Sequence, residues 1–295
     1  MMGHRGTNGC YKKKVKTRPY PWAEKKRTTI MGVINVTPDS FSDGGLYVTT
    51  DDVERQAKKL LKQGADILDI GGESSRPFSE AVSVKEELKR VLPAIDAVRS
   101  FSDCLISVDT TKAEVAYQAL SKGADIINDI SALRFDPEMA DVVSEAQVPV
   151  VLMHMKGTPQ DMQKNPVYDD VIREIKEFLH ERILWAQSKG IMQENVIVDP
   201  GIGFGKRFED NLVILNQLAK FLDLNAPILV GASRKAFLGA ITGEQDASKR
   251  DIATMGAVAA SIMNGTSIVR VHNVEMARTV ADVIDSIRNE ALPQR

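Results

Sequence analysis

The chain has few cysteines, few histidines and no long apolar run, and each scarcity excludes a class of protein. Only 2 cysteines occur among 295 residues, Cys10 and Cys104, which argues against a disulfide framework and favours a reducing, cytoplasmic location. The longest apolar runs, such as residues 226–230, are far too short to cross a bilayer. The 4 histidines are too scattered to indicate a zinc site. We therefore expect a soluble protein without a disulfide, a membrane span or a histidine–cysteine metal cluster.

Positive charge is concentrated at the start of the sequence. The first 27 residues contain nine Lys or Arg and the single acidic residue Glu24, a net charge of +8, so the remaining residues carry about −10. The run Lys12-Lys13-Lys14 could touch nucleic acid or acidic lipid, but a solvated extension is the simpler interpretation. We predict that residues 1–28 form a basic, disordered tail with no assigned nucleic-acid or membrane contact, and that residues 29–291 form one domain.

From residue 29 onward, short apolar segments alternate with polar turns and amphipathic stretches, which is typical of an α/β fold. Helices are expected, for example, at residues 52–63 and 251–263. Two similar segments, 64–69 and 123–128, each place a helix-ending glycine before a strand. The pattern predicts eight strands, at residues 30–35, 67–70, 105–109, 126–129, 148–153, 196–199, 228–230 and 268–270.

Polar residues follow nearly every predicted strand, and their distribution indicates the architecture. A doubly wound open sheet would also alternate strands and helices, but it concentrates functional groups at one switch point. Here candidates follow at least seven of the eight strands, as expected where the strand ends form a closed rim. The sequence therefore favours a single-domain TIM (β/α)₈ barrel with its site at the carboxyl ends of the strands.

Seven short motifs carry these polar residues, at positions 31–45, 69–77, 107–109, 127–129, 199–206, 233–235 and 270–272. Four of them, 31–45, 69–77, 199–206 and Arg270-Val-His272, resemble the signatures of the dihydropteroate synthase family in that family's order. The likeness extends from about residue 29 to 291. The resemblance implies condensation of 6-hydroxymethyl-7,8-dihydropterin diphosphate with 4-aminobenzoate, giving 7,8-dihydropteroate and pyrophosphate for folate biosynthesis.

By resemblance, polar residues at three strand ends bind the pterin, namely Asp109, Asn128 and Asp199. An alternative for any one of them is that it caps the following helix, and Asp129 suits that role better than Asn128 does. Lys235 resembles the family lysine that reaches the pterin carbonyl and lies near the aminobenzoate. Met153 is interpreted either as a contact to the pterin face or as a core methionine.

The diphosphate requires cations and oriented hydrogen-bond donors before its C–O bond can break. Arg270 and His272 end the eighth predicted strand, and their i, i+2 spacing places both side chains on one face. We predict that they act on the diphosphate together with Ser75 and Arg76, although a core salt bridge is the alternative for the pair. By resemblance, the amide oxygen of Asn35 binds Mg²⁺, a cation that prefers few protein ligands.

Two segments, 37–50 and 73–79, are rich in Gly, Ser and Pro and are expected to be mobile lids. By resemblance, Phe41, Pro77 and Phe204 flank the aminobenzoate ring beside Lys235. The sequence departs from the family pattern in three places: Ser75 replaces a threonine, Phe78 replaces a glycine, and Ala236 replaces the serine found in many members. The loss of that hydroxyl makes aminobenzoate binding the least secure implication.

The favoured mechanism is dissociative, and no residue is expected to act as a covalent nucleophile. Asn35, Lys235, Arg270 and His272 would carry the reaction by positioning substrates and stabilising charge. Two alternatives stay open: a pterin-binding methyltransferase barrel, which needs no pyrophosphate pocket, and a catalytically silent pterin-binding protein. The predicted helices at 251–263 and 274–287 also carry more apolar residues than the single face that packs on the barrel would need. These additional apolar residues predict a homodimer.

Overall fold

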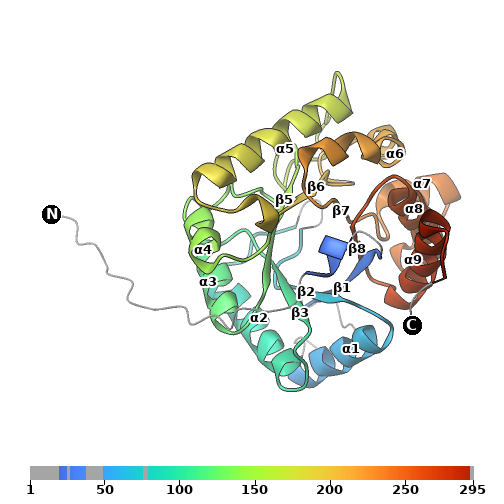
Figure 1. Cartoon of the computed structure of the whole chain (residues 1–295). Helices are drawn as coiled ribbons and strands as arrows, with labels where there is room; N and C mark the ends of the chain where they lie inside the picture. Colours follow the sequence, from blue (N-terminus) through green and yellow to red (C-terminus); the bar gives the residue numbers. More distant parts are fainter. Residues whose placement is uncertain (1–19, 25–26, 38–48, 76–78, 293–295) are drawn as a thin grey trace.

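Eight parallel strands form the centre of the molecule, with helices around them (Figure 1). The computed structural model describes residues 20–24, 27–37, 49–75 and 79–292. The strands pair in the order β6-β5-β4-β3-β2-β1-β8-β7, which confirms the predicted TIM-like barrel. Their bounds are β1 (Thr29–Asn35), β2 (Ile67–Gly71), β3 (Leu105–Asp109), β4 (Ile126–Asp129), β5 (Val150–Met153), β6 (Val196–Asp199), β7 (Leu229–Val230) and β8 (Ile268–Val271).

Helices connect the strands and cover the outside of the barrel. They are α1 (Thr50–Lys62), α2 (Val84–Arg99), α3 (Ala113–Ser121), α4 (Met139–Ala146), α5 (Val171–Ser188), α6 (Phe208–Asn216), α7 (Ala236–Thr242), α8 (Asp251–Met263) and α9 (Val274–Asn289). The helix predicted at 251–263 is confirmed, and the one predicted at 52–63 begins and ends slightly earlier as α1. Across the residues that the structure describes, no helix is long and apolar enough to span a membrane.

The barrel closes between β6 and β7, where the two strands share little backbone pairing. A single parallel bridge joins Val198 of β6 to Ile228, and the Val198 N–H donates to the Pro227 carbonyl at 2.9 Å. Pro227 has no N–H of its own to return to the ladder. The β6–β7 junction is therefore held by fewer backbone hydrogen bonds than the other strand pairs.

The interior of the barrel is filled by a small apolar cluster that includes residues from the predicted tail. Trp22, in a 3₁₀ turn at Pro21–Glu24, is 4% exposed and packs with barrel residues such as Met31, Ile197 and Ile268. Tyr20 stacks on Trp22 with ring centroids 4.8 Å apart. The predicted tail boundary at residue 28 is therefore too late, because this aromatic pair contributes to the barrel core. The rest of the predicted tail, 1–19 and 25–26, lies outside the described residues.

Side chains on the inward face of each strand change from apolar to polar toward the carboxyl end. Because successive inward side chains are two residues apart, Ile67 on β2 is followed by Asp69, and Ile197 on β6 is followed by Asp199. On β8, Ile268 is followed by Arg270. The barrel therefore has a layer of polar side chains at the carboxyl ends of its strands, directly above the apolar cluster that contains Trp22, here called the apolar plug.

The two similar Gly-Ala-Asp segments, at 64–69 and 123–128, both end a helix and connect the next strand to the preceding one. Gly64 and Gly123 adopt φ values of +97° and +103°, which confirms that each ends a helix in a left-handed conformation. The aspartate that follows accepts a hydrogen bond from the preceding strand: Asp66 from the Ile30 N–H at 2.8 Å, and Asp125 from the Ile106 N–H at 3.0 Å. Each repeat therefore fixes the entry of one strand against its neighbour.

We expect Asp285→Ala to destabilise the barrel because its carboxylate holds the start of β1. Asp285 accepts hydrogen bonds from the Thr28 N–H at 2.6 Å and the Thr28 hydroxyl at 2.8 Å, and it is 8% exposed. Leaving buried donors unpaired should lower the free energy of unfolding by about 2–3 kcal/mol, measured by urea denaturation. Asp282→Ala, one turn earlier on an exposed carboxylate paired with Arg278, is the matched control and should cost less than about 1 kcal/mol. Equal losses would show that the Thr28 contact is unimportant.

Candidate active site

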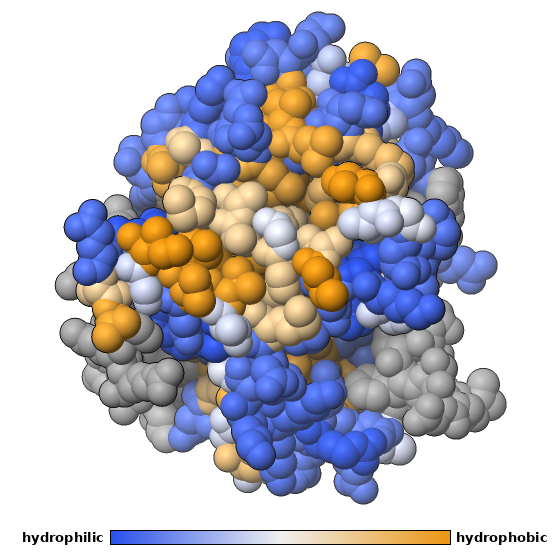
Figure 2. All heavy atoms as spheres, turned by 90° about the vertical axis from the view of Figure 1, so that its right-hand side faces the viewer, coloured by the Kyte–Doolittle hydropathy of each residue, from blue (hydrophilic) through white to orange (hydrophobic). Residues whose placement is uncertain are grey.

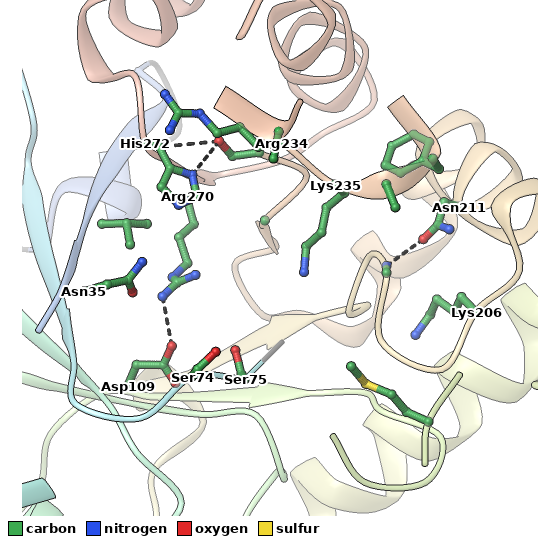
Figure 3. Close-up of a pocket in the computed structure, with 18 of the residues that line it drawn as sticks. Asn35, Ser74, Ser75, Asp109, Lys206, Asn211, Arg234, Lys235, Arg270 and His272 are labelled. Atoms are coloured by element: carbon green, nitrogen blue, oxygen red, sulfur yellow. Dashed lines mark hydrogen bonds and ion pairs between the residues drawn. The ribbon is translucent and has the colours of Figure 1, made fainter. Parts of the chain in front are cut away.

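A cavity of about 800 Å³ opens at the carboxyl ends of the strands. Figure 3 shows Asn35 and Asp109 on one side of it, Arg270 and His272 beside them, and Lys235 facing them from the β7–α7 turn. Ser75, from the loop after β2, also lines the cavity. The structure thus brings together six residues that the sequence singled out on five different loops or strand ends.

Arg270 lies at the base of this cavity between the buried Asp69 and the partly buried Asp109, and Figure 3 shows its bond to Asp109. Its Nε donates to Oδ2 of Asp69 at 2.6 Å, and its Nη2 donates to Oδ2 of Asp109 at 2.8 Å. Asp69 is fully buried, and its Oδ1 has no hydrogen-bond partner among the described residues. The sequence alone assigns no role to Asp69. Its position at the start of the 69–77 motif, two residues after the inward-facing Ile67, could have identified it as a site residue.

Burial raises the pKa of two carboxyl groups at these strand ends, Asp109 and Asp199. The pKa of Asp109 lies well above its ordinary value because the group is desolvated and Asp69 adds like charge, although Arg270 opposes both effects. The pKa of Asp199 is raised by burial to about 6, even though the Gly201 N–H donates to its Oδ1 at 2.6 Å. Asp109 and Asp199 therefore gain or lose a proton within two pH units of neutrality. A ligand that donates N–H hydrogen bonds to these carboxylates would favour their ionised form.

His272 is held as a neutral hydrogen-bond donor. Its backbone N–H lies 3.3 Å from the Ser233 hydroxyl oxygen, and that hydroxyl lies 2.9 Å from the ring Nδ1. Burial and the nearby cations Arg234, Arg270 and Lys235 lower the pKa of His272 to about 3. When the Ser233 hydroxyl donates to Nδ1, the neutral ring carries its proton on Nε2 and can donate from there. Ser233 was part of a predicted motif but had no predicted role.

Lys235 stands directly above an aromatic ring from the neighbouring loop. Its Nζ lies 4.0 Å from the centroid of Phe204, a cation–π contact. Lys235 is also the N-cap residue of α7, so the adjacent Ala236 occupies the first helical position and lines the cavity without a hydroxyl group. Arg234 instead makes a two-pronged ion pair with Asp251.

Four of the predicted site residues lie below the surface of this cavity rather than on its lining: Asn128, Met153, Asp199 and Phe204. The Asn128 amide donates to Asp69 at 3.3 Å. Met153 is 3% exposed and packs in one apolar cluster with Phe204 and Met162. Asp129 accepts from the Ser131 and Leu133 N–H groups, so it holds the turn after β4 and does not cap the following helix α4, whose N-cap residue is Glu138.

The loop after β6 packs against the loop after β5 so closely that side chains are excluded. A Cβ on Gly201, which has φ +70°, would lie 2.0 Å from the His154 carbonyl oxygen. A Cβ on Gly205, which has φ +60°, would lie 2.4 Å from the Lys156 carbonyl oxygen. These contacts require glycine. The loop ends at Lys206, a cavity-lining residue whose side chain is buried.

The loop after β2 is anchored by charge beside the cavity. Glu73 accepts from the Val82 N–H at 2.8 Å and forms an ion pair with Lys112, which also pairs with the fully buried Glu87. Ser74 and Ser75 extend from this anchored base toward the cavity (Figure 3). Three predicted site residues, Phe41, Arg76 and Pro77, lie outside the described residues, as does the departure Phe78.

Asn35 is the one predicted metal ligand, and its surroundings suit a cation that takes few protein groups. Its amide oxygen would lie 3.7 Å from a Cβ built on Gly71, so the missing side chain at Gly71 leaves space beside it. Within the described ranges, no three His, Cys, Asp or Glu residues are arranged to hold a metal ion. A hard amide oxygen facing an open cavity fits Mg²⁺, which usually keeps water or phosphate oxygens as its other ligands.

Comparison with known proteins gives one consistent family. Residues 31–272 match the sequence model of the family described as "Pterin binding enzyme". The dihydropteroate synthase of Synechocystis is 45% identical over 262 residues, covering 89% of this chain and 91% of that protein. A bifunctional folate synthesis protein of Arabidopsis thaliana is 44% identical, and this chain spans 50% of its length.

Solved structures give the same result. Dihydropteroate synthase of Yersinia pestis, solved in a sulfonamide complex, superimposes with a TM-score of 0.86 at 37% identity, covering 90% of this chain and 96% of that one. The Xanthomonas albilineans enzyme with 4-aminobenzoic acid superimposes with a TM-score of 0.85 at 42% identity, covering 91% and 95%. This chain belongs to the dihydropteroate synthase family of pterin-binding enzymes.

Proposed function

We propose that this protein condenses 6-hydroxymethyl-7,8-dihydropterin diphosphate with 4-aminobenzoate to give 7,8-dihydropteroate and pyrophosphate. The observation that carries the proposal is the buried polar layer in which Arg270 joins Asp69 and Asp109, next to the neutral donor His272. Such a layer offers acceptors to a heterocycle and donors to an anion within one cavity. Solved relatives from Xanthomonas albilineans contain 4-aminobenzoic acid and 7,8-dihydropteroate, which supports the same ligands here.

The pterin is the ligand that fits the deepest polar groups. Asp109 and Asp199 would accept hydrogen bonds from its N–H groups, and the Asn128 amide can both donate and accept. Lys235 would donate to the pterin carbonyl, and Met153 would pack against the ring face. Buried polar groups that match the aminopyrimidinone edge reject other heterocycles, because a wrong ligand leaves them unpaired.

The diphosphate would bind where donors face the mouth of the cavity. Nε and Nη2 of Arg270 are used by the two carboxylates, and we assign its Nη1 to a phosphate oxygen. His272 would donate from Nε2, and Ser75 from its hydroxyl, with Arg76 as the further predicted contact. Because His272 is neutral, its contribution is an oriented hydrogen bond, and the positive charge opposite the leaving group comes from arginine.

The aminobenzoate ring would lie against Phe204, close to Lys235. The ammonium group of Lys235 is held 4.0 Å from the centroid of that ring, so it would lie near a bound 4-aminobenzoate. The backbone N–H of Ala236 at the start of α7 can also face that carboxylate. Phe41 and Pro77 complete the predicted contacts, and their positions lie outside the described residues.

Mg²⁺ is part of the proposal through Asn35. The amide oxygen of Asn35 would hold it together with diphosphate oxygens, and the ion would supply charge neutralisation of the leaving group when bound. The chain's own residues position the substrates: buried carboxylates fix the pterin, and Arg270 and His272 fix the diphosphate. No general base is required before attack, because an arylamine is already neutral near pH 7. The C–O bond to pyrophosphate breaks, the amine nitrogen bonds to the remaining pterin cation, and the extra N–H proton passes to water or to the released pyrophosphate.

We also propose a homodimer through the face formed by α6, α7, α8 and α9. Figure 2 shows this side of the molecule, where apolar side chains form a broad area bordered by polar ones. Exposed apolar residues come from all four helices, and Ile252 of α8 is the most exposed among them at 80%. Apolar areas of this kind are typical of protein interfaces. The other contributors are Phe208, Leu212, Ile241, Met263, Val283 and Ile287.

Purified protein should release pyrophosphate from dihydropterin diphosphate and Mg²⁺ only when 4-aminobenzoate is added. Arg270→Ala should lower kcat/KM about 100- to 1000-fold, because it removes a charged donor to the leaving group. Asn35→Ala should also lower it and should raise the Mg²⁺ concentration needed for half-maximal rate. Binding of the pterin without pyrophosphate release would instead identify a silent pterin-binding protein, with Ala236 and Phe78 as the first residues to restore.

Affinity for 6-hydroxymethyl-7,8-dihydropterin should rise as pH increases from 5 through 7, because Asp199 and Asp109 both accept its N–H groups when ionised and both have raised pKa values. The pKa of Asp199 is raised to about 6 in the ligand-free protein, and N–H donation from the pterin would hold this group ionised. Binding below pH 6 therefore releases a proton, and this group contributes about tenfold in affinity per pH unit there. Calorimetry on the wild type and on Asp199→Asn tests this. An unchanged pH slope in the variant would contradict the assignment.

Light scattering coupled to size exclusion should give the mass of a dimer for the wild type. Ile252→Asp should give a monomer, because it places a charge at the centre of the proposed interface. Leu184→Asp is the control, since Leu184 is 54% exposed and belongs to α5, which is not one of the four helices of this face. A monomeric wild type, or dissociation by both variants alike, would rule out this interface.

A further inference from the structure

Lys206 ends the glycine-rich loop after β6 and has the most unusual environment of any lysine in the described residues. Its side chain is 2% exposed, and it is among the largest fully buried side chains in the molecule. Its Nζ lies within hydrogen-bonding distance of the Phe204 carbonyl at 2.9 Å, His154 Nδ1 at 3.0 Å and the His154 carbonyl at 3.4 Å. An ammonium group has three N–H donors, and here all three have protein acceptors.

We propose that Lys206 is a positioning residue for the second substrate. Its ammonium group joins the loop after β5 to the loop after β6, and this contact holds the Phe204 ring in place beneath Lys235. This inference rests on the proposed function, because Phe204 and Lys235 are the described residues assigned to the aminobenzoate. Lys206 ends the 199–206 motif, but the sequence alone assigns it no role, since two of its three acceptors belong to His154, 52 residues earlier.

The contact needs N–H donors because two carbonyls and a ring nitrogen converge on one buried point, where desolvation lowers the pKa of Lys206 to about 7. The Gly201 backbone approaches the His154 carbonyl so closely that no Cβ fits between them, and the His154 N–H donates in turn to the Asp199 carbonyl at 2.9 Å. The His154 ring is fixed from the other side by Phe178, edge-on with centroids 4.9 Å apart. An apolar side chain at position 206 would leave two carbonyls and an imidazole nitrogen unpaired.

A direct role in binding substrate fits this geometry less well. Lys206 lines the cavity, and Figure 3 places it near Asn211, across the view from Asn35 and Asp109. Turning its ammonium group toward a substrate would break the hydrogen bonds that hold the two loops together. Lys235, which does face the cavity, already supplies a cation close to the bound arylamine.

The path from Lys206 to the aminobenzoate passes through Phe204. The carbonyl that Lys206 binds belongs to Phe204 itself, so the backbone position of that residue depends directly on the ammonium group. The Phe204 ring is 8% exposed and packs against Met153 and Met162, with Lys235 over its face. Loss of the contact should therefore displace one side of the aminobenzoate site while leaving Asp109 and Asn128, on other strands, in place.

The test is the effect of Lys206→Met on the two Michaelis constants. The KM for 4-aminobenzoate should rise about tenfold or more, because its binding surface is disordered, while the KM for dihydropterin diphosphate should change less than about threefold. Tyr168→Phe is the matched control. It removes another bond between the same two loops, from the Tyr168 hydroxyl to the Gly205 carbonyl at 2.6 Å, and it should lower thermal stability without changing either KM.

A double-mutant cycle tests whether Lys206 acts through Phe204. Phe204→Leu should raise the KM for 4-aminobenzoate, and adding Lys206→Met to it should raise that KM less than about threefold further. His154→Phe gives an independent variant if Lys206→Met does not fold. It keeps the ring packing on Phe178 and removes one of the three acceptors, so the KM for 4-aminobenzoate should rise about two- to fivefold.

The outcomes separate this inference from the proposed function. A wild type that releases no pyrophosphate overturns the proposed function. An active wild type whose Lys206→Met and His154→Phe variants keep an unchanged KM for 4-aminobenzoate overturns the inference alone. Equal increases in both Michaelis constants would also overturn it, because they would indicate a general structural role or a contact with the diphosphate.

Discussion

The site depends on one guanidinium group shared by two buried carboxylates. Two acids and one base leave this part of the barrel with an unbalanced negative charge, and burial makes that imbalance expensive. Desolvation raises the pKa values of Asp109 and Asp199, and the like charge of Asp69 adds to the effect on Asp109. A ligand that brings N–H donors to these carboxylates satisfies groups that the protein leaves partly unsatisfied, and this is how a rigid pocket can select a polar heterocycle.

The regular geometry of the barrel makes this arrangement possible. Side chains two residues apart share a face, so one register shift of a strand would move Asp69, Asp199 or Arg270 from the interior to the helix layer. The apolar plug that includes Trp22 and Met31 lies beneath them and keeps water from the other end of the barrel away from the charges. Precise strand register and a dry interior are therefore conditions for the electrostatics of the site.

Much of the fold and of the site follows from the sequence, because strand ends are local signals. Asn35, Asp109, Asn128, Asp199 and Arg270 each end a short apolar run, and parallel strands bring such ends to one rim. The partners of these residues were harder to predict. Asp69 pairs with a residue 201 positions away, Ser233 reaches His272 across 39, and Trp22 fills the barrel from a segment that looks like a basic tail. Such pairings depend on tertiary geometry that periodicity does not encode.

The sparse closure between β6 and β7 has a mechanical consequence. This seam carries one bridge, between Val198 and Ile228, so its amide protons should be the first in the barrel to exchange with solvent. Asp199 lies on one side of the seam and Lys235 on the other. A ligand bonded to both would act as a clasp across it, adding the cohesion that the backbone ladder lacks there. The ligand-bound and ligand-free proteins would then differ most in the local stability of the junction between β6 and β7.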